Sequence, residues 1–324
     1  MTPLSPTPIV EPPITVENAD KVQWLRTLDI PDYNKGQISQ CSLAFSPDGR
    51  WLVGACGRNQ VPVWDVQSGR VRQLLYENPP QIVACTFSPS GASIACGGFD
   101  KTITLWNSET GKKIRELGSH DSPIWDIDFS PDGHKLISCG LTDDIRLWDV
   151  ERGETIWSYA GAKACLSVAF SPSGKTIAYG GRWGNAGVVD VATGKSITEL
   201  VKLANPIGDV TFSPTGKLLA AGTDDNLVYL WETETYQHVA TLEGHRGYVN
   251  GVSFSPTEGE TLLASGSHDK TLAIWDIAGQ RRLKTLVGHT DTVLRVAFSP
   301  AERGTLIASI SWDGTVRLWG VPGK

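Results

Sequence analysis

Hydrophobic and polar positions along this chain follow one pattern that occurs seven times. In each copy an apolar run leads into Phe-Ser-Pro, and a turn rich in Gly and small polar residues follows. A second apolar run, a second polar turn and a third run that often ends in Leu-Trp-Asp complete the copy. A period of about this length is typical of blade or solenoid arrays, so we predict a single repeat array. The seven copies begin 41 to 44 residues apart at Phe45, Phe87, Phe129, Phe170, Phe212, Phe254 and Phe298.

The copy from Tyr248 to Leu283 shows the predicted strands most clearly. Apolar residues alternate with a period of two in short segments, and turn residues such as Pro256 separate these segments. Four strands fit into each copy, and no stretch has a helical pattern of useful length. We therefore predict an all-β radial array of antiparallel strands. The predicted strands of this copy are 249–254, 262–264, 272–275 and a fourth that starts at Arg282.

Two dipeptides recur at fixed places in the copies. Gly-His occurs at Gly244-His245 and Gly288-His289, and Trp-Asp occurs at Trp64-Asp65, Trp148-Asp149 and Trp275-Asp276. With these motifs, the chain from Trp24 to Gly320 resembles the WD-repeat (WD-40) β-propeller family. The resemblance implies a seven-bladed β-propeller of four-stranded antiparallel blades. Looser variants of the second motif lie at Trp106-Asn107, Trp231-Glu232 and Trp319-Gly320.

The two ends of the array predict how the ring closes. The last copy stops after its third strand at Val316–Trp319, and the segment 22–28 resembles the fourth-strand segment 281–286. We expect the N-terminal strand to complete the last blade, because this removes an exposed sheet edge. Residues 21–324 would then form one propeller. Residues 1–20 contain five prolines and are expected to be a disordered tail or a short docking segment for another protein.

The composition of the chain disfavours several classes of function. The formal charge of -6 and the pI near 5.6 give no basic footprint, so we expect no nucleic-acid partner. No apolar run reaches the ~18 residues of a membrane helix, and the first residues lack the features of a secretory signal, so a cytoplasmic location is expected. The six cysteines lie on predicted core strands without CxxC spacing and are expected to be reduced thiols. We expect neither a metal nor a cofactor.

One quartet of residues resembles the Ser, His and acid of a catalytic triad. It comprises His245, Ser265, Asp269 and Trp275, and the same spacing recurs at His289, Ser309, Asp313 and Trp319. An enzyme rarely needs two such triads in adjacent repeats. By the family resemblance, these eight residues instead form a structural hydrogen-bond network inside two blades.

Other copies have lost part of this quartet. The third copy keeps His120, Ser138 and Trp148 but has Thr142 at the position of the acid. The fourth copy has lost nearly all of it, so packing is expected to hold that blade together. Its four corresponding residues are Gly161, Tyr179, Trp183 and Val189.

The family resemblance also predicts where a partner binds. Loops that enter the first strand and loops that join the second and third strands are expected on one face, which we call the rim. Tyr, Trp and Arg dominate interface hot spots, so an aromatic rim is a candidate binding surface. The alternative is that some of these rings plug the channel or pack under loops. The predicted partner-binding residues are Phe99, Trp125, Leu141, Arg182, Asp224, Tyr248, Asn250, His268, Leu294 and Trp312.

The sequence favours a non-enzymatic scaffold or assembly platform that binds segments of partner proteins on its rim. We expect a monomeric propeller within a larger complex. The alternative is an enzyme or a small-ligand binder that uses the mouth of the central channel. That alternative requires carboxylates or histidines that converge on the ring axis.

Overall fold

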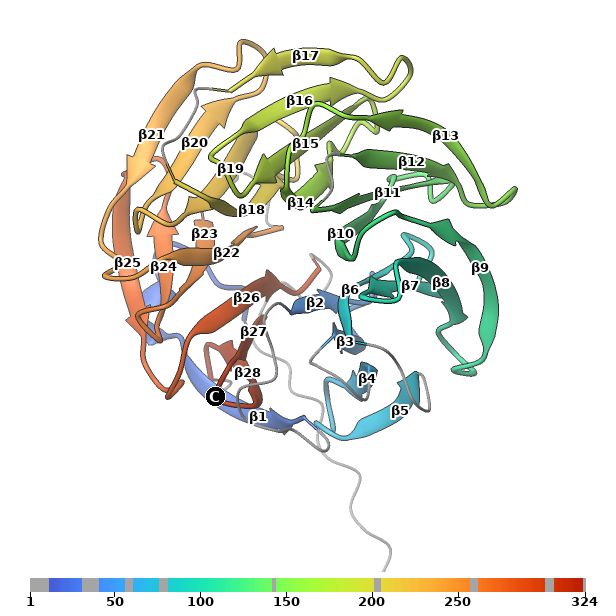
Figure 1. Cartoon of the computed structure of the whole chain (residues 1–324). Coiled ribbons are helices and arrows are strands. Elements are labelled where there is room, and N and C mark those ends of the chain that lie inside the picture. Colours follow the sequence, from blue (N-terminus) through green and yellow to red (C-terminus); the bar gives the residue numbers. More distant parts are fainter. Residues whose placement is uncertain are drawn as a thin grey trace, which may run out of the picture.

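The computed structural model describes residues 12–30, 41–55, 61–75, 81–141, 144–200, 205–256, 262–300 and 306–322. These residues form seven four-stranded antiparallel sheets arranged as a ring (Figure 1). The only helical turn among them is η1 (Ala19–Lys21). None of the described helical residues makes a segment long and apolar enough to cross a bilayer. The predicted all-β seven-bladed propeller is confirmed.

Each blade runs outward from an innermost strand to an outermost strand. Blade one comprises β2–β5, and the following blades comprise β6–β9, β10–β13, β14–β17, β18–β21 and β22–β25; blade seven comprises β26–β28 and β1. The strands are β1 (Gln23–Asp29), β2 (Ser42–Phe45), β3 (Trp51–Ala55), β4 (Val61–Asp65), β5 (Val71–Leu75), β6 (Ile82–Phe87), β7 (Ser93–Gly98), β8 (Thr102–Asn107), β9 (Lys113–Ser119), β10 (Ile124–Phe129), β11 (Lys135–Gly140), β12 (Ile145–Asp149), β13 (Glu154–Tyr159), β14 (Cys165–Phe170), β15 (Thr176–Gly181), β16 (Ala186–Asp190), β17 (Ser196–Glu199), β18 (Ile207–Phe212), β19 (Leu218–Thr223), β20 (Val228–Glu232), β21 (His238–Leu242), β22 (Val249–Phe254), β23 (Leu262–Ser267), β24 (Leu272–Asp276), β25 (Arg281–Leu286), β26 (Val293–Phe298), β27 (Leu306–Ser311) and β28 (Thr315–Gly320).

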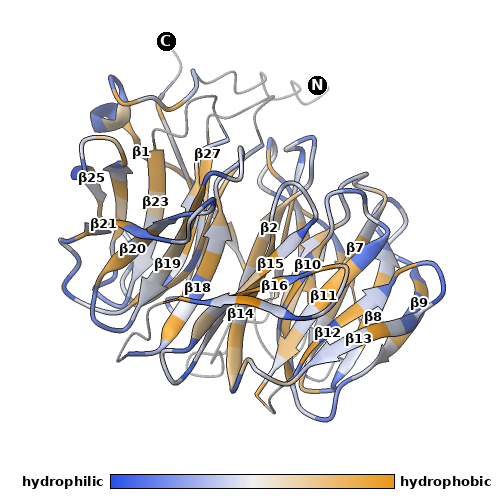
Figure 2. Cartoon of the chain, turned by 90° about the horizontal axis from the view of Figure 1, so that it is seen from above, coloured by the Kyte–Doolittle hydropathy of each residue, from blue (hydrophilic) through white to orange (hydrophobic). Residues whose placement is uncertain are grey.

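Burial along a blade follows the position of the strand. In blade six, every residue of the middle strands β23 and β24 is buried, whereas most of the outer strand β25 is not. Middle strands pack against a neighbouring blade on both faces and therefore tolerate unbroken apolar sequence. Figure 2 shows hydrophobic colour mainly on the strands and hydrophilic colour mainly on the loops that connect them. The cores lie between blades: Val249, Val252 and Phe254 of blade six share a cluster with Ala220 and Leu230 of blade five.

The turn after Phe-Ser-Pro needs glycine in most blades. In blade two, Gly91 has φ +73°, a left-handed conformation that side chains with a Cβ rarely adopt. A Cβ built on Gly91 would lie 3.5 Å from Cδ of Pro47 in the preceding turn. The repeated Pro and Gly therefore fit adjacent turns against each other on the face opposite the rim.

The two ends of the chain close the ring in blade seven. Strand β1 pairs antiparallel with β28, with Trp24 opposite Trp319 and Leu28 opposite Val316. Leu28 is fully buried. The outermost strand of this blade thus comes from the start of the chain, and the predicted closure is confirmed.

Part of the predicted tail packs on the ring. Ile14 and Ala19 are fully buried in the cluster that also holds Leu286 and Trp319 of blades six and seven. The sequence prediction placed the start of the ordered chain too late, because a few apolar residues among prolines give no periodic signal. Residues 1–11 lie outside the described residues, and for them the prediction stays a prediction.

Candidate functional site

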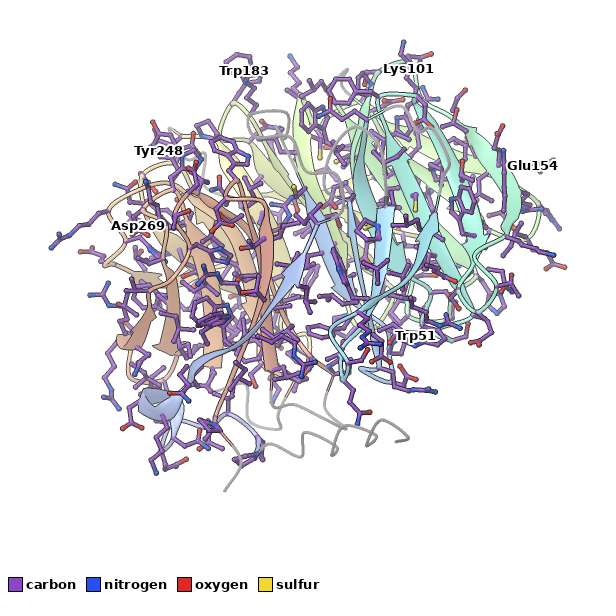
Figure 3. The ribbon with its side chains drawn as sticks, turned by 90° about the horizontal axis from the view of Figure 1, so that it is seen from below. Trp51, Lys101, Glu154, Trp183, Tyr248 and Asp269 are labelled. Atoms are coloured by element: carbon purple, nitrogen blue, oxygen red, sulfur yellow. The ribbon has the colours of Figure 1, made fainter. Side chains whose placement is uncertain are left out.

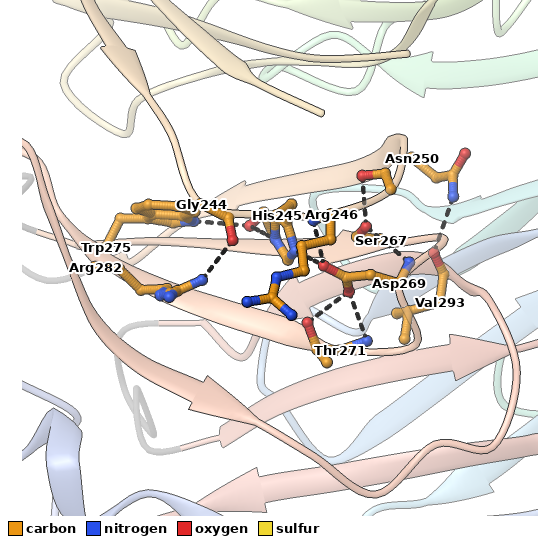
Figure 4. A network of polar contacts seen from close by, with 12 residues as sticks. Gly244, His245, Arg246, Asn250, Ser267, Asp269, Thr271, Trp275, Arg282 and Val293 are labelled. Atoms are coloured by element: carbon orange, nitrogen blue, oxygen red, sulfur yellow. Dashed lines mark hydrogen bonds and ion pairs between the residues drawn. The ribbon is translucent and has the colours of Figure 1, made fainter. Parts of the chain in front are cut away.

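The quartet of blade six forms a chain of hydrogen bonds through the blade interior (Figure 4). The indole N–H of Trp275 donates to Ser265 Oγ at 2.7 Å, and His245 Nε2 lies 2.7 Å from the same oxygen. His245 Nδ1 lies 2.9 Å from Asp269 Oδ2, which also accepts the backbone N–H of Arg246. The loop that enters the blade is thereby tied to its second and third strands.

Blade seven repeats this geometry. Trp319 donates to Ser309 Oγ at 2.8 Å, and His289 lies 2.8 Å from both Ser309 Oγ and Asp313 Oδ2. Burial raises the pKa of Asp313, but the hydrogen bonds from His289 and Thr315 outweigh it and hold this pKa well below its usual value. Burial lowers the pKa of His289. The pair is therefore held as a neutral imidazole beside a carboxylate near pH 7.

The quartets are placed for structure rather than for nucleophilic chemistry. A nucleophilic serine must reach a substrate, but Ser265 and Ser309 are 0% exposed and their hydroxyl oxygens face indole N–H groups. The quartets of blades six and seven have the same geometry, and we call each of them a fastener because it ties the strands and the incoming loop of its blade together. Chains of buried, satisfied hydrogen bonds of this kind make a fold rigid.

Blade three contains a variant of the quartet. His120 Nε2 lies 2.6 Å from Ser138 Oγ, which also accepts the Trp148 indole N–H at 2.7 Å. The carboxylate near the histidine is that of Asp144, whose Oδ1 lies 3.5 Å from His120 Nδ1. Thr142, which the sequence placed at the position of the acid, lies outside the described residues. Burial lowers the pKa of His120 to about 4.

Blade four replaces the quartet by aromatic and aliphatic packing. Tyr179 is buried at the serine position and hydrogen-bonds to Tyr159, with ring centroids 5.9 Å apart. Val189 is fully buried at the tryptophan position, whereas Trp183 is 66% exposed. A Cβ on Gly161 would lie 2.2 Å from Tyr159 Oη, so the tyrosine pair occupies the space of the histidine. Packing holds this blade, as the sequence predicted.

Sequence reasoning missed a charged cluster at the ring centre. Arg295 is 9% exposed, and its Nη1 donates to the carbonyl of Asn250 at 2.6 Å and to that of Gly208 at 3.2 Å. Ser167 Oγ lies within hydrogen-bond distance of two carboxylates, 2.9 Å from Asp126 Oδ2 and 3.0 Å from Asp209 Oδ1. These residues belong to the innermost strands of blades three to seven, which surround the middle of the ring (Figure 1).

The sequence does contain a signal for this cluster. Asp126, Ser167, Asp209 and Arg295 each lie three residues before the repeated Phe, in strands that are otherwise largely apolar. Burial raises the pKa of Asp126 to about 6, and the Arg295 guanidinium opposes this shift. Arg295 therefore compensates the charge of the partly buried carboxylates around it.

The cysteines and acids of the described residues give no evidence of a metal centre. Cys41, Cys85, Cys96, Cys139 and Cys165 are free and buried; Cys56 lies outside the described residues. Burial raises the pKa of the Cys85 thiol to about 12. The described part of the chain contains no group of three or more His, Cys, Asp or Glu side chains arranged to hold a metal.

Two aromatic groups form on the rim. In the first, which we call the three-ring cluster, the His268 ring lies between those of Tyr248 and Trp312, at centroid distances of 5.0 Å and 5.4 Å. In the second, the Phe99–Trp125 pair, the rings meet edge to face at 5.9 Å. Phe99 is 41% exposed and Tyr248 is 46% exposed. Figure 3 shows Tyr248, Trp183 and Lys101 at one face of the ring and Trp51 toward the other.

The remaining predicted rim residues divide into two sets. Arg182 is exposed, and Leu141 and Asp224 are partly buried. Leu294 is 6% exposed within a hydrophobic cluster, so its assignment to a binding surface is wrong. Asn250 donates to the Val293 carbonyl at 3.2 Å, which links blade six to blade seven. A repeat position alone does not reveal which side chains are already used between blades.

Comparison with known proteins matches most of the chain to one family. The family described as "WD domain, G-beta repeat" matches residues 27–65, 71–107, 111–149, 195–232, 236–276 and 280–320. The stretch between the third and fourth matches contains β14–β16 of blade four, where the quartet is absent.

Individual relatives match short parts of the chain. The U5 small nuclear ribonucleoprotein 40 kDa protein of Homo sapiens is 42% identical over 48 residues, 15% of this chain and 13% of the relative. The meiotic recombination protein rec14 of Schizosaccharomyces pombe is 34% identical over 98 residues, 30% of this chain and 32% of the relative. Pre-mRNA-processing factor 19 of Oryza sativa is 34% identical over 68 residues, 20% and 13% respectively. The chain thus covers at most a third of the length of these relatives.

Proposed function

Because this chain belongs to the WD-repeat family, we propose that it is a non-enzymatic platform that binds segments of partner proteins on its rim. The observation that carries the proposal is the pair of aromatic groups on one face, the three-ring cluster and the Phe99–Trp125 pair. Half-exposed aromatic rings supply large contact areas at low entropic cost, as in interface hot spots. The names of the relatives refer to ribonucleoprotein and recombination proteins and support a role in protein assemblies.

The ring centre argues against the alternative function at the channel. Arg295 of blade seven reaches across the ring interior and donates to backbone carbonyls of blades five and six. Its guanidinium is thus already hydrogen-bonded within the ring. The acids that converge here, Asp126 and Asp209, are partly exposed, but they already accept hydrogen bonds from Ser167 and from backbone N–H groups. An enzyme would need such acids to be free to exchange a proton with a substrate.

The proposal is tested by affinity capture from a lysate of the source cells, followed by mass spectrometry. The bait variant is Phe99→Ala/Tyr248→Ala, since both side chains are half exposed and their loss should leave the fold intact. We expect a partner that the wild type retains and this variant loses. Equal recovery of every protein by both baits would contradict the rim proposal.

A matched control keeps the result specific. Ile114 and Ile156 are 52% and 46% exposed on the outer strands β9 and β13, away from the rim. The Ile114→Ala/Ile156→Ala variant removes similar apolar exposure and should retain the partner. Fractionation of the same cells tests the expected cytoplasmic location, which we carry forward as part of the proposal.

A further inference from the structure

The three-ring cluster lies beside two carboxylates. Asp224 belongs to the loop after β19, and Asp291 lies just before β26. Both carboxylates act electrostatically on His268, the central ring of the cluster. Asp224, His268 and Trp312 occupy the same repeat position in blades five, six and seven, because the backbone N–H of each donates to a carbonyl of the loop that enters its own blade. The rings and the two acids therefore lie on neighbouring blades of the rim.

The charges at this point are not balanced. Burial raises the pKa of Asp224, and the neighbouring Asp225 raises it further, while His268 lowers it. The described residues donate no hydrogen bond to the Asp224 carboxylate. Asp291 is engaged through Oδ1 by the backbone N–H of Thr292. A partly buried carboxylate without a donor gains from any cation that reaches it.

The histidine does not supply that cation near neutral pH. Burial lowers the pKa of His268 from its usual value of 6.5, although Asp224 and Asp291 oppose the shift. His268 is therefore mainly neutral at pH 7. The rings of His268, Tyr248 and Trp312 therefore lie near the net negative charge of Asp224 and Asp291.

We propose, on the basis of the platform function proposed above, that the three-ring cluster and Asp224 form an anchor site for a basic side chain of the bound segment. The charged head of an arginine or lysine would pair with Asp224, with Asp291 adding to the attraction. Its aliphatic stem and cationic head would contact Tyr248 and Trp312, which supply apolar area and cation–π attraction. The Phe99–Trp125 pair, in blades two and three, would contact a separate part of the segment.

The test uses four pools of synthetic peptides with degenerate flanks and one fixed central residue: Arg, Lys, Gln or Glu. Binding to the full chain is measured by fluorescence anisotropy at pH 7.5. We expect the Arg and Lys pools to bind about tenfold more tightly than the Gln pool, as cation–π and charge pairing of this size imply. The Glu pool should bind most weakly, and added salt should reduce the preference for the basic pools.

The variant Asp224→Asn removes the charge at nearly constant volume and should reduce the preference for the basic pools to about twofold or less. Asp121→Asn serves as the control, because Asp121 pairs with Arg146 in blade three, and this variant should keep the wild-type preference. Unchanged thermal melting shows that both variants are folded. Tyr248→Leu, which keeps apolar area, should weaken the basic pools and leave the Gln pool nearly unchanged.

The outcomes separate the two proposals. If all four pools bind the wild type equally, or if Asp224→Asn keeps the full preference, the anchor is wrong and the platform proposal stands. If the Glu pool binds best, the anchor is also wrong. If no pool binds the wild type at all, both the anchor and the binding of protein segments on the rim are contradicted.

Discussion

Blades six and four have the same four-stranded frame but differ in the chemistry of their interiors. Ser265 in blade six accepts the Trp275 indole N–H and contacts His245, whereas Tyr179 at the same repeat position of blade four packs against Tyr159. Both blades are buried to a similar extent along their middle strands. The same four-stranded frame is thus stabilised by buried hydrogen bonds in blade six and by side-chain packing in blade four.

Blade four, which lacks the quartet, is joined to its neighbours at the centre of the ring. Blade four contributes Ser167 to the ring centre, where its Oγ lies within hydrogen-bond distance of acids of blades three and five on either side. Blade four is thus linked to both neighbours at the ring centre although it lacks the quartet. Variants of these residues separate the contribution of the frame from that of the fasteners.

The largest effect is expected when the ring is opened. Deletion of residues 1–28 removes β1, so β28 becomes an exposed edge and the buried Leu28 is lost. We expect the whole ring to lose cooperative unfolding, as measured by calorimetry. Deletion of residues 1–11 is the control and should leave the melting transition in place. A normal cooperative transition in the longer deletion would show that β1 does not close the ring.

The next effect comes from the ring centre. In Arg295→Met, the partly buried Asp126 and Asp209 are left without their cation, which costs about 3–5 kcal/mol of unfolding free energy. Arg295→Lys keeps the charge and should lose less. Urea unfolding measures both variants at pH 7.5. A loss below about 1 kcal/mol in Arg295→Met would mean that the cluster does not tie the blades together.

The two interiors can be compared directly by matched substitutions. Ser265→Ala leaves the Trp275 N–H and His245 without a buried partner and should cost about 2–3 kcal/mol. Tyr179→Phe removes one hydroxyl from blade four and should cost about 1 kcal/mol. Urea unfolding gives the two losses. An equal loss in both variants would remove the distinction between a fastened and a packed blade.

A smaller effect depends on pH at the junction of blades three and four. Asp128 Oδ2 accepts the Phe170 N–H at 2.8 Å, and burial raises the pKa of Asp128 to about 7. The folded state therefore holds this proton more tightly than the unfolded state, so the contribution of Asp128 to stability is lost as pH rises through 7. Relative to Asp128→Asn, the wild type should lose about 1–2 kcal/mol between pH 6 and pH 8. A constant difference over this range would show that Asp128 is already ionised at pH 6.

The sequence predicts the frame well because its signals are local and repeated. Phe-Ser-Pro marks the end of each innermost strand, and the segment 22–28 resembles a fourth strand closely enough to predict β1. The eight quartet residues also lie where their spacing places them.

The candidate site is less predictable, because it depends on contacts between blades. Leu294 occupies a rim position in the repeat but packs into the core, and Asn250 bonds to blade seven. Arg295 lies in an apolar strand, and its partners come from two other blades. No local pattern tells which blades approach one another closely enough for such contacts.

The measurement that tests the account most directly compares two double variants for stability and for partner binding. Ser265→Ala/Ser309→Ala alters the fasteners of blades six and seven, and Phe99→Ala/Tyr248→Ala alters the rim. Melting temperature and the amount of partner captured below the transition are measured for each. We predict that the first variant melts lower yet keeps the partner, and that the second melts like the wild type yet loses it. Loss of the partner in the fastener variant, with its melting unchanged, would contradict a structural role for the quartets and return them to the functional site.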